Sequence, residues 1–223
     1  SPYLASVLRK DPTAYWRLEE TTGTAAAYDF TGNGHSFAYH DAPTRTGTGT
    51  DIGPRPAEFG GMPADNRAPT LTGQPLTEGD GYLGIVSNVL TGQNDYSAEM
   101  WFRPGTDTNP HYDYLLHRGT GDNSGDYLGL TSSGTGSAYN KLYVFNGSDS
   151  TLAYGATTLT TGEWYHVGMT RSGDNVTVYL NGLPIAEFST SMVAKSGLTS
   201  GQWAFGGRSD NYGQQKFSGN IDE

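Results

Sequence analysis

The sequence consists of short runs in which apolar residues recur at every second position, separated by clusters of glycine, asparagine, aspartate, serine and threonine. In the run Tyr96–Arg103, Tyr96, Ala98, Met100 and Phe102 point to one side, and the residues between them point to the other. An amphipathic helix would space its apolar residues three or four positions apart. The period of two therefore predicts antiparallel sheets with one buried face.

A second clear pattern is the hairpin Glu163–Asn181, in which two alternating runs flank the turn Ser172–Asn175. The pair Asn181-Gly182 then reverses the chain into a strand over 183–188. Further strands are expected over Ala14–Leu18, Ser36–His40, Ala57–Phe59, Tyr82–Val86, Asp113–His117, Tyr127–Thr131, Lys141–Phe145, Trp203–Gly206 and Lys216–Ile221. About a dozen strands are enough for two facing sheets.

Only the first residues are typical of a helix. Ser1 and Pro2 can supply its cap and first turn, and Asp11-Pro12 ends it. A chain of 223 residues suits one all-β sandwich. The stretch 41–77, rich in proline and glycine, is interpreted as loops, so we expect residues 1–223 to form a single domain.

The charge balance excludes one class of partner. Lysine and arginine number 13 against 23 acidic residues, a net charge of −10, and binding to nucleic-acid phosphates needs clustered cations. No apolar run approaches the length of a membrane span, about 18 residues. The absence of cysteine excludes disulfides and thiolate zinc sites. Carboxylates scattered through glycine-rich loops suit calcium instead.

Six passages carry a resemblance to a known family: Ala14–Glu20, Asp29–Gly34, Tyr96–Pro104, Glu163–Val167, Val178–Gly182 and Phe217–Glu223. In this order, and over almost the whole chain, they resemble the laminin-G-like, concanavalin A-like jelly-roll domains of bacterial secreted proteins. The resemblance implies an all-β, two-sheet antiparallel jelly-roll sandwich, here with a short N-terminal helix. It also implies an extracellular location and a face or rim that binds glycans or proteins, often with calcium.

A structural calcium ion is the first site hypothesis. Asp29 and Asn33 lie in a loop where Gly32 and Gly34 let oxygen ligands converge, and Asp222 lies in the last strand, expected to run near the opening segment. A cation held by these three residues would join the start of the chain to its end. The alternative is that Asp29 and Asn33 form an Asx turn, while Asp222 pairs with an arginine.

A carbohydrate site is the second hypothesis. Sugars present flat apolar faces ringed by hydroxyls, so a binder needs exposed aromatic rings beside polar groups. Several loops offer this combination, and their candidate ligand-binding residues are His111, Tyr112, Asp122, Tyr139, Arg208 and Tyr212. For any one tyrosine, packing at the rim of the sandwich is the alternative.

Catalysis is not expected. Retaining glycosidases of this fold carry two glutamates on one strand, in the pattern Glu-x-Asp followed by a second glutamate. The nearest stretch is Asn220–Glu223, where asparagine replaces the first glutamate. Glu99 lies near Arg103, which suits an ion pair. A lyase using tyrosine, histidine and arginine from separate strands remains an alternative.

We therefore expect a non-catalytic extracellular lectin-like module that binds a polysaccharide or a surface glycoprotein and is stabilised by calcium. It would bind no nucleic acid, have no membrane span and belong to a larger multidomain protein. One alternative is a protein-binding interaction domain of an adhesin or fibre tip, active in cell adhesion. The other is a polysaccharide hydrolase or lyase of the same fold.

Overall fold

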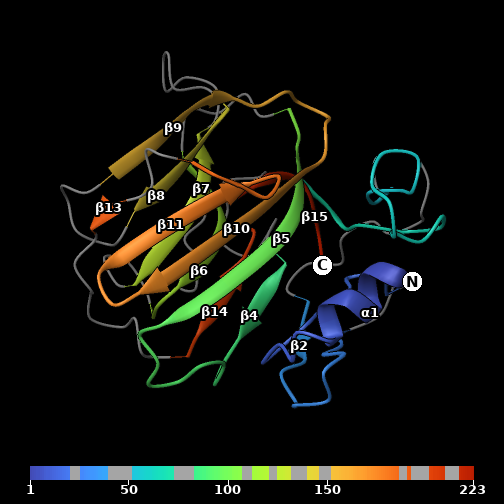
Figure 1. The fold of residues 1–223 in the computed structure, drawn as a ribbon, viewed down its shortest axis with the longest axis horizontal. Coiled ribbons are helices and arrows are strands. Elements are labelled where there is room, and N and C mark those ends of the chain that lie inside the picture. Colours follow the sequence, from blue (N-terminus) through green and yellow to red (C-terminus); the bar gives the residue numbers. More distant parts are fainter. Residues whose placement is uncertain are drawn as a thin grey trace.

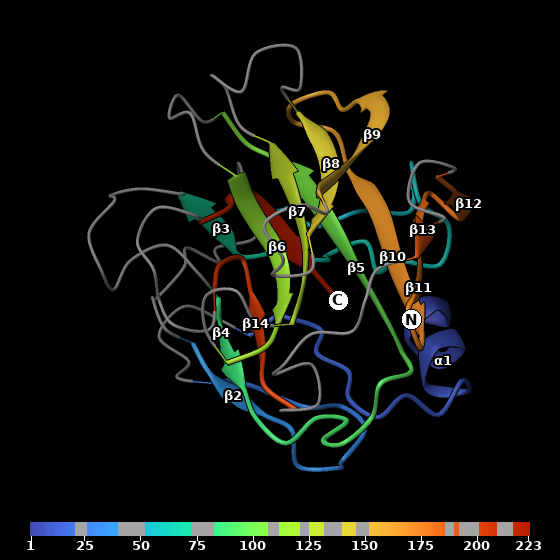
Figure 2. The same ribbon diagram turned by 90° about the vertical axis from the view of Figure 1, so that its left-hand side faces the viewer.

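Two antiparallel sheets lie face to face in this protein, as two layers with one core between them (Figures 1 and 2). They are seen in a computed structural model that describes residues 1–20, 26–39, 52–72, 83–106, 112–120, 125–131, 140–145, 152–185, 190–191, 201–208 and 216–223. The predicted all-β, two-sheet antiparallel jelly-roll sandwich with a short N-terminal helix is confirmed.

The first sheet contains the predicted run and hairpin. Its strand order is β12 (Leu183–Pro184), β11 (Asn175–Leu180), β10 (Tyr165–Ser172), β5 (Tyr96–Pro104), β15 (Ser218–Asp222) and β3 (Thr70–Thr72), and β13 (Thr190–Ser191) pairs with β11. The register places Val167 opposite Met100 and Ile221 opposite Phe102. These four side chains therefore share the face that points to the core.

The second sheet has the order β4 (Gly84–Val86), β14 (Trp203–Phe205), β6 (Tyr112–Arg118), β7 (Asp126–Thr131), β8 (Lys141–Phe145) and β9 (Leu152–Thr158). A separate two-stranded ribbon pairs β1 (Ala26–Ala27) with β2 (Phe37–Ala38). Leu128 and Leu130 of β7 and Val144 of β8 meet the core face of the first sheet. Burying a side chain of this size contributes about 1.5–3 kcal/mol.

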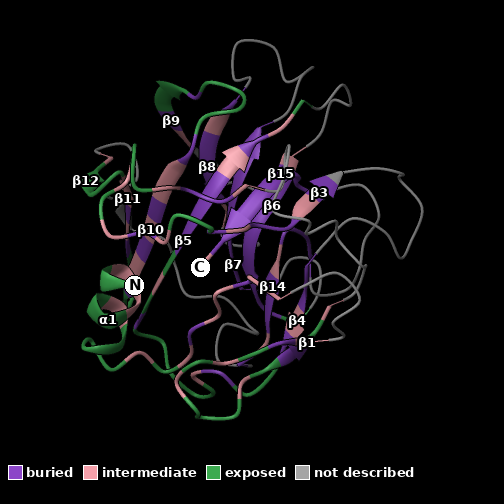
Figure 3. Ribbon diagram, turned by 90° about the vertical axis from the view of Figure 1, so that its right-hand side faces the viewer, coloured by how far each residue is buried: buried purple, intermediate pink, exposed green. Residues whose placement is uncertain are grey.

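Helix α1 (Pro2–Leu8) begins as the sequence predicts. The backbone N–H of Leu4 donates to Ser1 Oγ at 3.2 Å, and Pro2 lies in the first turn. None of its residues is buried, and the helix lies at the side of the sandwich, close to the C-terminus (Figures 1 and 3). No helix in the described part of the chain is long and apolar enough to cross a membrane.

Several predicted strands differ from the structure. Within Ala14–Leu18 only a single bridge forms, between Trp16 and Asp29. The predicted strand Ala57–Phe59 is a turn, because the N–H groups of Glu58 and Phe59 donate to the carbonyl of Arg55. Strands β3 and β9 were not predicted. Residues 186–188 of the predicted strand 183–188 lie outside the described residues.

Candidate functional site

Aromatic side chains cover the face of the second sheet that points away from the core. Along β7 and β8, leucines and a valine enter the core, and the aromatic residues alternate with them. These aromatic side chains contact one another in a cluster that we call the tyrosine face: Tyr112, Tyr114, Tyr127, Tyr143, Phe145 and Tyr154. Because side chains alternate across a strand, these residues must share the opposite surface of the sheet.

Strand register arranges the tyrosine face in rows that cross the strands. In one row Tyr114, Gly129, Tyr143 and Tyr154 stand opposite one another on β6, β7, β8 and β9. A Cβ atom on Gly129 would lie 2.5 Å from Cε1 of Tyr143, so glycine leaves the space that this ring occupies. The Tyr143 ring centroid is 5.2 Å from that of Tyr112 and 6.2 Å from that of Tyr114.

The neighbouring row contains His117, Tyr127 and Phe145. The imidazole of His117 lies flat on the Tyr127 ring, with 4.2 Å between centroids and 1° between planes. Tyr127 and Phe145 are 5.5 Å apart. These contacts hold the rings in fixed positions. A ligand that binds them therefore loses little affinity to the entropy cost of ordering the rings.

Access is confined to part of the tyrosine face. Tyr112, Phe145 and Tyr154 are half-buried, whereas Tyr114, Tyr127 and Tyr143 are buried. The Tyr143 hydroxyl has no hydrogen-bond partner in the described structure. The hydroxyls of Tyr112 and Tyr154 are hydrogen bonded at 2.9 Å. Desolvation, followed by that hydrogen bond, raises the pKa of Tyr154 to about 12, so the Tyr154 hydroxyl keeps its proton at neutral pH.

Two of the six predicted ligand-binding residues lie in the described structure. Tyr112 belongs to the tyrosine face, on β6. Arg208 follows β14 and is only 4% exposed, so its side chain is not an open rim group. The other four, His111, Asp122, Tyr139 and Tyr212, lie outside the described residues.

The loop of Asp29 is held by hydrogen bonds to its own carboxylate. Oδ1 accepts from the N–H of Tyr15 and from the N–H and hydroxyl of Thr31, and Oδ2 accepts from the N–H of His35. Partial desolvation raises the pKa of Asp29, but these donors outweigh it and lower that pKa overall. The contact with Thr31 N–H closes an Asx turn, and Asn33 Nδ2 donates to the carbonyl of Thr13.

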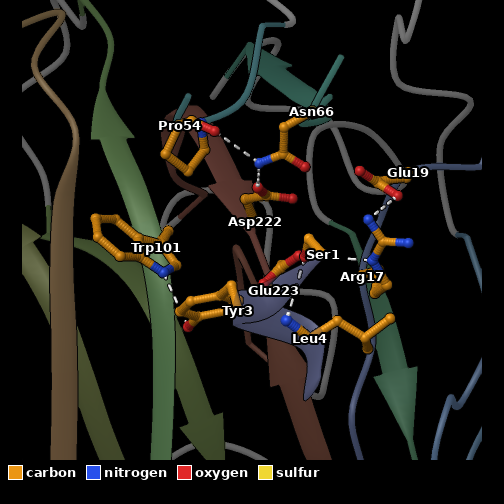
Figure 4. A network of polar contacts seen from close by, with 10 residues as sticks. All are labelled: Ser1, Tyr3, Leu4, Arg17, Glu19, Pro54, Asn66, Trp101, Asp222 and Glu223. Atoms are coloured by element: carbon orange, nitrogen blue, oxygen red, sulfur yellow. Dashed lines mark hydrogen bonds and ion pairs between the residues drawn. The ribbon is translucent and has the colours of Figure 1, made fainter. Parts of the chain in front are cut away.

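Asp222 lies in a different group of contacts, here called the Asp222 cluster: Asp222, Asn66 and Glu223 (Figure 4). Asn66 Nδ2 donates to Asp222 Oδ2 at 2.8 Å and to the carbonyl of Pro54 at 3.0 Å. Glu223 Oε1 is 3.6 Å from Arg17 Nε. No described hydrogen bond or ion pair joins Asp222 to Asp29 or Asn33, so the structure brings together only two of the three predicted calcium ligands.

The Asp222 cluster contains several buried oxygens that lack a hydrogen-bond partner. Asp222 Oδ1, Asn66 Oδ1 and both carboxylate oxygens of Glu223 are buried without a hydrogen-bond partner. Burial, and then the charge of Glu223, raise the pKa of Asp222 well above its usual range, and burial raises the pKa of Glu223 to about 6. The described residues contain no group of three or more histidine, cysteine or acidic side chains suited to a metal. Two carboxylates and one amide oxygen are nevertheless ligands that calcium accepts.

The stretch resembling a glycosidase motif is structural. Asn220 Oδ1 accepts from Nε and Nη2 of Arg103, at 3.0 and 2.8 Å, and its Nδ2 donates to the carbonyl of Pro69 and to Thr70 Oγ1. Glu99 does not pair with Arg103 in these contacts. Its Oε2 is 3.6 Å from Nε2 of His166.

Sequence reasoning missed most of the tyrosine face. It located the strands around residues 113–117, 127–131 and 141–145 but sought binding aromatics only in loops. A signal was present, because Tyr127 alternates with leucines on β7, and Tyr143 and Phe145 alternate with apolar residues on β8. Two apolar faces on one strand indicate that the second face is covered or binds a partner.

Comparison with known proteins identifies related sequences and folds. A family model described as the concanavalin A-like lectin/glucanases superfamily (Laminin_G_3) matches residues 77–223. No match was found among curated proteins.

Three solved structures illustrate the similarity of fold. Domain 4 of AbnA, a GH43 extracellular arabinanase from Geobacillus stearothermophilus in complex with arabinotriose, is 22% identical with a TM-score of 0.52, and 94% of this chain and 88% of that one are covered. A heptameric SAP-like pentraxin from Limulus polyphemus is 17% identical with a TM-score of 0.50, covering 69% and 72%. Trypanosoma rangeli sialidase with sialic acid is 11% identical with a TM-score of 0.59, and the match covers 94% of this chain but 30% of the sialidase.

Proposed function

This chain belongs to the concanavalin A-like lectin/glucanase superfamily, and from that premise we propose that it is a non-catalytic extracellular module that binds carbohydrate through the tyrosine face. The observation that carries the proposal is the set of register-aligned aromatic rows on the face of the second sheet that points away from the core, where Tyr112, Phe145 and Tyr154 are partly exposed. Aromatic rings pack against the C–H faces of sugars, while tyrosine hydroxyls exchange hydrogen bonds with sugar hydroxyls.

The accessible part of the site is the group Tyr112, Phe145 and Tyr154. Because Tyr112 and Tyr154 are joined through their hydroxyls, a sugar hydroxyl can insert between them or extend that chain of hydrogen bonds. Buried Tyr143 behind them fixes the ring of Tyr112. The site thus combines a rigid apolar surface with two hydrogen-bonding hydroxyls, which suits a polysaccharide segment.

The comparisons support a carbohydrate ligand over a protein. The arabinanase domain, which this chain matches over 94% of its length, was solved with arabinotriose, and the sialidase was solved with sialic acid. Arabinan is therefore the first polysaccharide to test. An extracellular location fits the same comparison, because the arabinanase is extracellular.

The non-catalytic part of the proposal rests on Asn220. Its hydrogen bonds tie β15 to β5, to Thr70 of β3 and to Pro69 just before β3. The position where a glycosidase of this fold would carry a glutamate thus holds an amide with a structural role. The tyrosine face carries hydroxyls and is flanked by His117 and Lys141, but none of its six residues is a carboxylate.

We further propose that a calcium ion binds at the Asp222 cluster. Asp29 and Asn33, predicted from the sequence as its partners, do not fit, because four donors already occupy the Asp29 carboxylate. Oxygens of Asp222, Asn66 and Glu223 would hold the ion instead: Asp222 Oδ1 and Asn66 Oδ1 lack a hydrogen-bond partner, and Glu223 Oε1 lies 3.6 Å from Arg17 Nε. When bound, calcium would neutralise two buried carboxylates and satisfy oxygens that otherwise lack partners.

Binding can be tested by titrating the protein with arabinan and a panel of other polysaccharides in a calorimeter. The Tyr154→Ala variant should bind about tenfold more weakly, a loss of about 1.4 kcal/mol, because it removes both a ring and a hydroxyl partner. Tyr28→Ala is the matched control, since Tyr28 is 55% exposed and lies outside both large sheets. Tyr28→Ala should bind like the parent protein.

Three results would contradict the proposal. Equal affinity of the Tyr154→Ala and parent proteins would place the ligand elsewhere. Release of reducing ends or unsaturated products over time would make the protein an enzyme. Saturable binding to cells without affinity for any glycan would favour the adhesin alternative, with a protein partner.

A further inference from the structure

Charged residues are few on the strands that carry the tyrosine face, and all but one of them point away from it. The lysine, arginine and acidic residues of β6–β9 are Asp113, Arg118, Asp126 and Lys141. Leu130 and the residues that alternate with it on β7 enter the core, and the register places Asp113 opposite Leu130 and Arg118 opposite Asp126. These three charged side chains therefore lie on the core side, and each is 2% exposed or less.

Lys141 has the opposite orientation. It alternates on β8 with Tyr143 and Phe145 of the tyrosine face, and it stands opposite the exposed residue Thr158 on β9. Lys141 is half-buried, and its backbone N–H and carbonyl both bond to the Thr131 hydroxyl. Its ammonium has no hydrogen bond or ion pair within the described part of the chain. Among the described residues of β6–β9, the tyrosine face is thus bordered by one available cation and no carboxylate.

Lys141 lies close to the accessible rings. Tyr143, two residues along β8, pairs with Tyr154, so the backbones of Lys141 and Tyr154 are about 7 Å apart along the strand and about 5 Å apart across it. The flexible four-carbon stem of lysine can span much of that separation. In the pair formed by Tyr112 and Tyr154, one hydroxyl donates to the other, and the accepting hydroxyl keeps its own proton for a ligand. This proton and the ammonium are two donors beside the same rings.

We propose that the tyrosine face prefers acidic polysaccharides, and that Lys141 binds the carboxylate of a uronic acid unit. This inference rests on the proposed function and names the class of glycan. The sugar ring would pack on Tyr112 and Tyr154, and its carboxylate would accept hydrogen bonds from the ammonium and from the free tyrosine proton. Two donors match the two oxygens of a carboxylate, and charge-assisted hydrogen bonds are about twice as strong as neutral ones. Because the net charge of −10 repels acidic polymers, binding them requires a local cation such as this one.

The probes are polygalacturonate and the same polymer after its carboxyl groups have been reduced to primary alcohols. Each polymer is titrated with the whole protein in a calorimeter at low salt, and the two differ only in the carboxylate. We expect the parent protein to bind polygalacturonate about five- to tenfold more tightly than the reduced polymer. Salt at about 0.5 M should remove most of this preference, because the lysine is partly exposed and its charge is screened.

Two substitutions of Lys141 and one control separate its charge from other effects. Lys141→Gln should lose the preference and bind the two polymers equally, whereas Lys141→Arg should keep it because the cation is retained. Lys10→Gln removes one positive charge from an exposed residue after α1, outside both sheets, and should keep the full preference. The measured quantity is the ratio of the two affinities. Partial unfolding of a variant lowers both affinities and leaves that ratio unchanged, so it does not imitate the loss of Lys141.

Three results would overturn this inference but not glycan binding itself: equal affinity of the parent protein for the two polymers, a preference that survives in Lys141→Gln, or a preference that is also lost in Lys10→Gln. Tighter binding of a sulfated galactan than of polygalacturonate would overturn it as well, because the anion recognised would not be a carboxylate. Failure of the parent protein to bind either polymer or arabinan would overturn the proposed function together with this inference.

Discussion

Asp126 and Arg171 form an ion pair inside the sandwich, where their side chains are 1% and 0% exposed. Arg171 Nη1 donates to both oxygens of Asp126, at 2.9 and 3.0 Å, and the hydroxyl of Tyr96 donates to Oδ2 at 2.8 Å. The guanidinium of Arg118 lies 4.7 Å from the Tyr96 ring centroid and donates to the carbonyls of Leu90 and Gln93. The buried guanidinium of Arg171 is therefore stabilised by the Asp126 carboxylate, and that of Arg118 by the Tyr96 ring and two backbone carbonyls.

Removing that carboxylate should be costly. Asp126→Ala removes the one buried carboxylate that pairs with Arg171 in the described structure, and we expect the free energy of unfolding to fall by about 3–5 kcal/mol in urea titrations. Asp174→Asn is the control, because Asp174 is 54% exposed and 4.0 Å from the same guanidinium. That change should cost less than about 1 kcal/mol. Similar losses in the two variants would show that burial does not decide the contribution of this pair.

His166 should make stability depend on pH. Burial lowers the pKa of His166, and the charge of Glu99, 3.6 Å away, offsets only part of that effect. Below the unfolded pKa of about 6.5 the unfolded chain takes up a proton that the folded imidazole resists, so stability is lost as pH falls through that value.

Urea titrations at pH values on either side of about 6.5 measure the His166 contribution. His166→Gln cannot titrate, so its stability relative to the parent protein should increase as the pH falls from about 7.5 to about 5.5. A difference between the two proteins that is constant with pH, or that changes in the opposite direction, would show that the folded His166 pKa is not lowered.

Local chemistry was predictable from single residues, but distant pairing was not. The Asx turn at Asp29 depends on a donor two positions along the chain, so the sequence already contained both partners. Asp126 and Arg171 are 45 positions apart, and each lies in a strand where a polar residue normally indicates a solvent-facing position. Nothing in the sequence signals that these two point inward to each other.

At the scale of elements, the second sheet depends on close packing between β6, β7 and β8. Gly129 stands between Tyr114 and Tyr143 in the register. A Cβ atom there would lie 2.2 Å from the carbonyl oxygen of Asp113 and 2.5 Å from the Tyr143 ring. The strands and the tyrosine face thus require a residue without a side chain at this position.

Gly129→Ala should therefore lower the free energy of unfolding by about 1–3 kcal/mol, through overpacking, and weaken carbohydrate binding by displacing Tyr143. Gly168→Ala, on β10, is the matched control. A Cβ atom there finds its nearest neighbours at 3.9 Å, so the change should leave stability within about 0.5 kcal/mol. Thermal melts and the calorimetric titration measure both effects. A Gly129→Ala protein with unchanged stability would show that β7 can shift away from Tyr143.

Strand prediction succeeded where the alternating pattern was long. Tyr96–Arg103 and the hairpin Glu163–Asn181 correspond to β5, β10 and β11, since period-two patterns extend over many residues there. Ala57–Phe59 was wrongly predicted as a strand. Phe59 is apolar because its ring packs on Trp101, with 4.6 Å between the ring centroids, but it does so from within a turn. β3 has only three residues and takes its place from pairing with β15, which the sequence does not reveal.

At the scale of the whole molecule, the opening segment and the last strand lie together, as the jelly-roll resemblance implied. Arg17 pairs with Glu223, Trp101 Nε1 donates to the Tyr3 hydroxyl, and Asn66 reaches Asp222 across 156 positions (Figure 4). The sequence predicted that Asp222 lies near the opening segment, but not its contact with Asn66, because spacing cannot show which groups already exchange hydrogen bonds.

Calcium should stabilise the whole fold by joining these distant segments at the Asp222 cluster. At about 100 times its dissociation constant, an ion that binds only the folded state contributes about 2.7 kcal/mol, which raises the melting temperature by about 5–10 °C in a chain of this size. The expected shift in melting temperature appears in calcium-loaded protein and disappears with excess chelator.

Two variants locate the ion. Asp222→Asn should abolish the shift, because an amide carries no charge and has only one oxygen, so it cannot supply both carboxylate oxygens of Asp222. Asp29→Asn should keep it, since the Asp29 oxygens already accept backbone donors. Identical melts with calcium and with chelator would exclude a stabilising ion, and a shift lost in Asp29→Asn but kept in Asp222→Asn would return the site to the Asp29 loop.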